Sequence, residues 1–154
     1  MQDGIHAFPP RVILGNVFRE QFRIADAASG AVRDVLEEKV DTYYESGNGR
    51  VNWRYLPGSN EAIWYSQKDN WGQLYLHDLQ TGRQKSQLTS GEGNVTQLLR
   101  IDETTRTMYY QGVGKEAKRD PYFRHFYRQT MDGKAPQLLT PALARDASWL
   151  ITMG

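Results

Sequence analysis

The segment Leu74-Tyr-Leu-His-Asp-Leu-Gln-Thr-Gly82 decides the fold. Two leucines alternate with Tyr75 and His77, and this run is followed by an aspartate and by a glycine that closes a turn. Similar segments end at Gly30 and Gly133, and the three glycines are 52 and 51 residues apart. Each glycine is followed by a polar run with a leucine, namely Val35-Leu36, Leu88-Thr89 and Leu139-Thr140. A period of about 50 residues that carries hairpin signals predicts repeated antiparallel β-units.

The residues on both sides of this segment predict one four-stranded unit. Runs of β-branched and aromatic residues are bounded about every 8–12 residues by Gly, Pro, Asn or Asp, and helical periodicity is hard to find. The turn Pro57-Gly-Ser-Asn60 joins the first two runs. The predicted strands cover residues 51–56, 62–66, 73–78 and 85–89. Four strands in about 40 residues are typical of one blade of a β-propeller.

The same cycle continues in both directions along the chain. The fold class predicted is all-β, a partial β-propeller of about two and a half to three four-stranded antiparallel blades, because a closed ring needs about four to eight. Strands before residue 50 are predicted at 12–14, 21–24 and 32–36, and strands after residue 94 at 95–101, 107–110, 124–128 and 136–140. The chain divides into 1–50 (last strands of an incomplete blade and a connecting loop), 51–94 (a complete blade), 95–141 (a complete blade with a surface insertion at 112–122) and 142–154 (an unassigned tail).

Composition excludes several classes of function. Nineteen Lys and Arg balance 18 Asp and Glu, and no block of one sign is long enough to suit nucleic acid or a lipid surface. Cysteine is absent, which removes disulfides, thiol catalysis and thiolate metal sites. No apolar run suits a membrane span, and Met1-Gln-Asp-Gly-Ile-His6 is not a signal peptide. The compartment stays unknown; an exported or periplasmic parent protein would carry its signal outside this sequence.

Residues with catalytic chemistry form no recognised pattern. Ser90-Gly-Glu-Gly93 lies between two predicted strands and lacks the Gly-x-Ser-x-Gly elbow of serine hydrolases, so a plain turn is favoured. The three histidines, His6, His77 and His125, have no second ligand at metal spacing. We therefore expect no catalytic residue, metal or cofactor. Propeller glycosidases use paired carboxylates near the axis, for which the candidates are Asp41, Glu45 and Glu92.

The segment Tyr43-Tyr-Glu-Ser-Gly-Asn-Gly-Arg50 is the candidate for a substrate-binding loop. It precedes a first strand and combines aromatic rings, one acid, one base and residues that tolerate unusual backbone angles. The side chains expected to bind are Tyr44, Glu45 and Arg50. An ordinary connection between blades is the alternative interpretation.

A set of motifs in a fixed order resembles the N-terminal propeller of dipeptidyl peptidase IV-like serine peptidases. The resemblance spans residues 20–141 and is carried by Asp26-Ala-Ala-Ser-Gly30, Val35-Leu-Glu-Glu38, Asp41-Thr-Tyr43, Ile63-Trp-Tyr-Ser66, Asp69-Asn-Trp71, Leu74-Tyr-Leu76, Gln87-Leu-Thr-Ser-Gly91, Asn94-Val-Thr96, Asp120-Pro-Tyr122, Phe126-Tyr127, Asp132-Gly133 and Leu138-Leu-Thr-Pro141.

The resemblance implies a parent protein in which an eight-bladed propeller covers an α/β-hydrolase domain that removes N-terminal dipeptides. The Ser-Asp-His triad of such proteins belongs to the hydrolase domain, so this chain alone is expected to be inactive and to gate and orient short peptides in the parent. The family also uses a glutamate pair to hold the substrate amine. Glu37-Glu38 does not match that motif, and no functional residue is carried over.

An incomplete ring also predicts contact between copies of the chain. Two or three blades leave two apolar sheet faces uncovered, to which Trp53, Trp64 and Trp71 are expected to contribute. We therefore expect self-association. The alternative function is a stand-alone, oligomerising propeller-type module that binds peptides or proteins.

Overall fold

The computed structural model describes residues 5–8, 11–14, 17–40 and 52–140, and the side chains of 21–39 and 52–140. These residues form strands and turns, and none of them is helical. The strands are β1 (Ile5–Phe8), β2 (Arg11–Leu14), β3 (Val17–Asp26), β4 (Val32–Val40), β5 (Arg54–Leu56), β6 (Glu61–Ser66), β7 (Gln73–Asp78), β8 (Gln84–Gln87), β9 (Asn94–Asp102), β10 (Thr107–Val113), β11 (His125–Thr130) and β12 (Gln137–Leu138).

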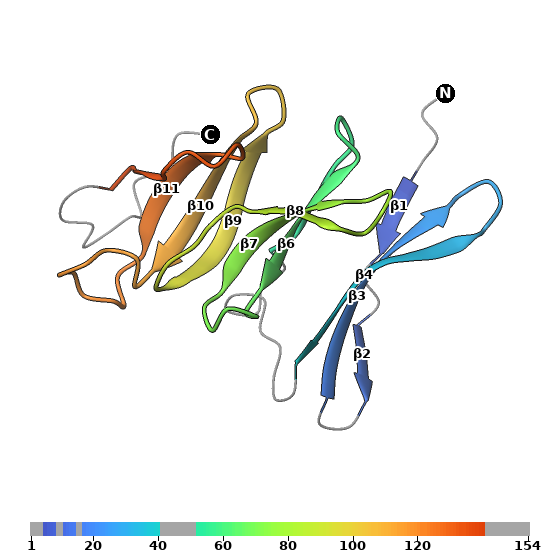
Figure 1. Ribbon diagram of the computed structural model, residues 1–154, viewed down its shortest axis with the longest axis horizontal. Coiled ribbons are helices and arrows are strands. Elements are labelled where there is room, and N and C mark those ends of the chain that lie inside the picture. The colour runs from blue at the N-terminus through green and yellow to red at the C-terminus, as the bar shows by residue number, and fades with distance from the viewer. Residues whose placement is uncertain (1–4, 9–10, 15–16, 41–51, 141–154) are drawn as a thin grey trace.

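The strands form three four-stranded antiparallel sheets that follow one another along the chain (Figure 1). The second sheet has the order β5-β6-β7-β8, and the third runs from β9 to β12 in the same way. Each of these two is a simple up-and-down meander, as in a propeller blade. The predicted fold class, an all-β partial propeller, is confirmed.

The first sheet is built differently from the other two. We expected three strands before residue 50, and the structure adds a fourth, the four-residue strand β1. Both β1 and β2 pair with β3, β1 near Asp26 and β2 near Glu20, while β4 pairs along nearly the whole of β3. The short β1 and β2 thus share one edge of β3, and the sheet is three strands wide.

Two apolar clusters join neighbouring sheets. Strand β6 is buried on both faces: Ala62 and Trp64 belong to the cluster with the first sheet, and Ile63 and Tyr65 to the cluster with the third. Alternate side chains of a strand point to opposite faces, so one strand supplies both clusters. The second sheet is therefore covered by a neighbour on each side.

The expected exposure of three tryptophans is wrong for two of them. Trp64 is buried, and its ring lies edge-on to Phe22 of the first sheet at 6.4 Å between centroids. Trp53 also packs edge-on against Phe22, at 5.3 Å. The first sheet covers these rings because Phe22 on β3 reaches the face of β6. Trp71, at 41% exposure, is open to solvent as expected.

The repeating turn explains the change in period from 52 to 51 residues. In the second sheet, the Asp78 carboxylate accepts a hydrogen bond from the Thr81 amide at 2.8 Å, and Gly82 closes the turn at φ +72°. In the third sheet, Thr130 stands at the aspartate position and Gly133 follows one residue sooner. A turn that is one residue shorter accounts for the lost residue.

Candidate functional site

The predicted substrate-binding loop lies outside the described residues. This applies to Tyr44, Glu45 and Arg50, and to the carboxylate candidate Asp41. Their role stays a prediction.

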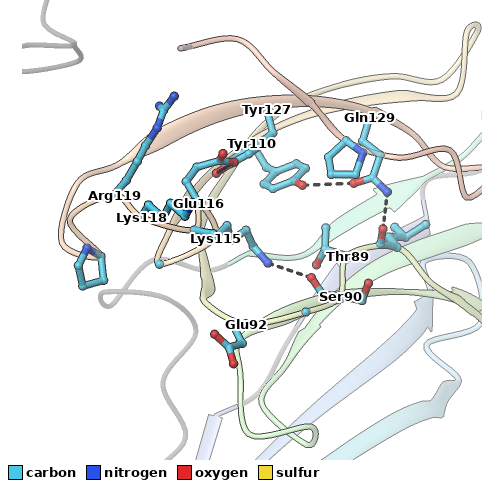
Figure 2. A pocket seen from close by; sticks show the side chains of 16 residues that line it. Thr89, Ser90, Glu92, Tyr110, Lys115, Glu116, Lys118, Arg119, Tyr127 and Gln129 are labelled. Atoms are coloured by element: carbon cyan, nitrogen blue, oxygen red, sulfur yellow. Dashed lines mark hydrogen bonds between the residues drawn. The ribbon is translucent and has the colours of Figure 1, made fainter. Parts of the chain in front are cut away.

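A pocket of about 450 Å³ lies between the second and third sheets at one end of the strands (Figure 2). One wall is the connection from β8 to β9, residues 88–92, and the other is part of the loop between β10 and β11. Tyr110, Tyr127 and Gln129 of the third sheet complete the lining. The turn Ser90-Gly-Glu-Gly93 and the candidate carboxylate Glu92 are thus brought to one pocket, which sequence reasoning did not foresee.

The β10–β11 loop begins and ends two residues later than the predicted insertion at 112–122. Gly112 and Val113 continue β10, where they pair with Val95 and Asn94 of β9, and the loop covers residues 114–124. Gly93 brings the two walls together: its φ is +83°, and a Cβ there would lie 2.3 Å from the Val113 carbonyl oxygen. Only glycine fits this conformation and this close approach.

Lys115 reaches from this loop into the space between the sheets. Its Nζ donates to Gln73 Oε1 at 3.1 Å and to the Ser90 carbonyl oxygen at 3.4 Å. Within the described part of the chain, Lys115 forms no ion pair. Burial lowers the pKa of the Lys115 ammonium to about 8, because a charge is less stable away from water.

Two stacked tyrosines form the opposite side of the pocket. The rings of Tyr110 and Tyr127 are 5.1 Å apart at 17°. The Tyr110 hydroxyl donates to Gln129 Oε1 at 3.2 Å, and Gln129 Nε2 donates to the Leu88 carbonyl oxygen at 2.6 Å. The Tyr127 hydroxyl donates to Glu116 at 3.0 Å. Burial raises the pKa of both phenols, so they stay protonated at neutral pH.

This lining is suited to binding rather than to catalysis. It offers two lysines, an arginine, two glutamates, hydroxyls, an amide group and two aromatic rings, but no nucleophile hydrogen-bonded to a histidine. Across the residues that the structure describes, no group of three or more His, Asp or Glu could hold a metal ion. Within those same residues, no helix is long and apolar enough to cross a membrane.

The carboxylates of Glu37 and Glu38 connect strands and sheets. Glu37 accepts a hydrogen bond from Gln21 on the neighbouring strand at 2.6 Å. Glu38 accepts from Trp64 Nε1 and from the Ser66 hydroxyl, both at 2.7 Å, and so links the first sheet to the second. Both groups are thus engaged in hydrogen bonds of the fold.

A second pocket, of about 350 Å³, lies beside the turns between β5 and β6 and between β9 and β10. Arg106 in its lining donates to Glu61 at 2.9 Å, and Lys85 and Ser59 donate to the same carboxylate. Burial alone would raise the pKa of Glu61, but these three donors outweigh it and lower the pKa. The cluster ties the second sheet to the third.

Comparison with known proteins places the chain in a family. The family described as the dipeptidyl peptidase IV (DPP IV) N-terminal region matches residues 18–152, so this chain belongs to that family. The resemblance found in the sequence motifs is confirmed.

A solved structure is similar in fold. It is a provisionally assigned dipeptidyl aminopeptidase IV from Bacteroides ovatus ATCC 8483, 16% identical, with a TM-score of 0.57. The similarity covers 84% of this chain and 22% of that one, so this chain spans about a fifth of the length of its solved relative.

Proposed function

We propose that this chain is the non-catalytic propeller portion of a dipeptidyl-peptidase-like serine exopeptidase, which removes N-terminal dipeptides, and that the propeller gates and orients the peptide substrate. The family match over residues 18–152 carries this proposal. The repeated blades support it, because the β8–β9 connection of the second sheet and the β10–β11 loop of the third line one pocket.

The chain is expected to be inactive by itself. It lacks the Gly-x-Ser-x-Gly elbow that would position a nucleophilic serine, so it has no means of forming an acyl-enzyme. Short peptides are its proposed partners within the parent protein.

A chromogenic dipeptidyl substrate tests the proposal in two arms. The purified chain should release no chromophore, whereas the protein encoded by the complete reading frame should release it and should be blocked by a serine-directed inhibitor. Release by the chain alone, or none by the complete protein, would overturn the proposal.

A stand-alone binding module that oligomerises is the second candidate. Two aromatic side chains in the β10–β11 loop favour it: Tyr122 is 88% exposed and Phe123 is 47% exposed. Exposed aromatic residues are common at protein interfaces. Light scattering should then give a mass that rises with concentration, and less so in a variant with both rings replaced by serine. A monomer at high concentration would eliminate this candidate.

A further inference from the structure

The pocket between the second and third sheets holds Lys115, which forms no ion pair with any residue that the structure describes. We propose that this pocket binds the carboxylate group of a ligand of short-peptide size, and that the Lys115 ammonium is the group that pairs with it. This inference concerns the chain itself and does not depend on the hydrolytic activity proposed for the parent protein.

The surroundings of Lys115 are arranged for an anion. Both of its acceptors, the Gln73 side chain and the Ser90 carbonyl, are neutral dipoles. A partly buried ammonium such as that of Lys115 makes stronger hydrogen bonds to a carboxylate than to neutral acceptors. Its aliphatic stem passes close to Gly112, where an added Cβ would lie 3.1 Å from Lys115 Cδ. The two hydrogen bonds hold the ammonium in place before any ligand arrives, which lowers the entropy lost on binding.

The remaining charges of the lining favour an anion with a single charge. Glu92 and Glu116 also line the pocket, and they would repel a dianion such as phosphate more strongly than a carboxylate. Lys118 and Arg119 line it as well, but Figure 2 shows the Arg119 side chain extended away from Lys115. A carboxylate next to Lys115 thus balances the lining better than a group with two negative charges.

The size and the apolar part of the pocket suit a small organic ligand. Its volume of about 450 Å³ falls within the range of about 300–1,000 Å³ that is usual for small-molecule sites. The stacked rings of Tyr110 and Tyr127 form an apolar part of the lining, and Thr89 and Gln129 add polar groups to it; all four side chains belong to buried residues. A ligand of two or three residues with a free carboxylate matches this combination.

Binding should weaken as the pH rises through about 8, the pKa of Lys115. The deprotonated amine loses its attraction for a carboxylate. The raised pKa values of Tyr110 and Tyr127 keep both phenols neutral there. The other charged groups that line the pocket are Glu92, Glu116, Lys118 and Arg119.

The test is a calorimetric titration of the whole chain with N-acetyl-dialanine and, in parallel, with its C-terminal amide. The acid should bind at least about tenfold more tightly than the amide, and K115M should remove about that factor, since a buried charge pair is lost. The matched control K134M changes an exposed lysine outside the lining and should leave the affinity unchanged.

A second variant keeps the test decisive if K115M folds poorly. K115R retains its charge at every accessible pH. It should therefore still bind the acid at a pH of about 9.5, where the unmodified chain has lost most of its affinity. Equal binding of acid and amide, unchanged binding by K115M, tighter binding of inorganic phosphate, or no binding by the unmodified chain would overturn the proposal. None of these results would bear on whether the complete protein hydrolyses dipeptidyl substrates.

Discussion

The second and third sheets each contain an equivalent hydrogen bond at the start of their third strand, which is β7 in one and β11 in the other. In the second sheet, the Thr89 hydroxyl accepts a hydrogen bond from the Leu74 amide at 2.9 Å. In the third sheet, the Thr140 hydroxyl accepts from the Phe126 amide at 3.1 Å. In both, a threonine after the fourth strand satisfies an amide of the third, which fastens the outer strand to its own sheet.

The residue that precedes this amide differs between the two sheets, and its side chain makes different contacts in each. Gln73 donates to the carbonyl oxygens of Gly91 and Gly93 and accepts a bond from Lys115 of the next sheet. His125, at the same position in the third sheet, contacts Thr140, and its buried Nε2 has no hydrogen-bond partner among the described residues. The bond from the amide to the threonine hydroxyl therefore occurs in both sheets. The side chain that precedes the amide differs, and in the second sheet it links to the third through Lys115.

Replacing the turn glycine of each sheet, Gly82 or Gly133, should give the largest difference in unfolding free energy between the second and third sheets. A Cβ on Gly82 would lie 2.1 Å from the Val35 carbonyl oxygen of the first sheet, whereas one on Gly133 would meet no atom within 4 Å. Both have positive φ, so G133A should cost about 1 kcal/mol of unfolding free energy. G82A must also displace backbone and should cost about 3 kcal/mol or more. Urea titration measures both, and equal losses would contradict a close contact between the first two sheets.

The next largest effect should come from Glu61, whose side chain is 2% exposed. Thr107 occupies the corresponding position in the third sheet, and within the described residues its hydroxyl donates to the Thr105 carbonyl oxygen alone. Because hydrogen bonds to a charged group contribute about 1.5–3 kcal/mol, E61A should lower the unfolding free energy by about 2 kcal/mol, and T107A by about 1 kcal/mol or less.

Acid provides the internal control for Glu61. The folded-state pKa of Glu61 is lowered, so its contribution is present above the unfolded pKa and disappears as the pH falls through the folded value. The difference in unfolding free energy between the unmodified chain and E61A should therefore become smaller as the pH falls. A difference that does not change with pH would mean that packing rather than charge is responsible.

The shared threonine bond should give equal effects in the two sheets. T89V and T140V each leave a backbone amide without its acceptor, which costs about 1–2 kcal/mol. We expect the two losses of unfolding free energy to agree within about 0.5 kcal/mol. A much larger loss for T89V would show that its second bond, from Thr89 to Gln73 at 2.7 Å, contributes strongly.

The sequence predicted the features that depend on neighbours in the chain. The alternation around Leu74 and the aspartate–glycine turn at Gly82 are local, so the strands and turns of the second sheet followed from them. The burial of Trp64 could not be predicted, because it depends on Phe22 of another sheet. The same holds for the pocket: Lys115 is partly buried where Gly93 brings two loops together, and the periodicity of the sequence does not predict that contact.

The smallest expected effect comes from replacing His125 by the residue type of the second sheet. Since its Nε2 lacks a partner in the described structure, H125Q should change the unfolding free energy at neutral pH by less than about 0.5 kcal/mol. Burial, with a smaller contribution from Arg119, lowers the pKa of His125. The unfolded chain therefore takes up a proton first, and stability falls as the pH drops below about 6.5. H125Q should be less sensitive to this change, although His77, whose pKa burial also lowers, keeps part of it. Urea titrations at several pH values between neutral and acid measure the slope, and a steeper slope in H125Q would mean that protonation of His125 stabilises the fold.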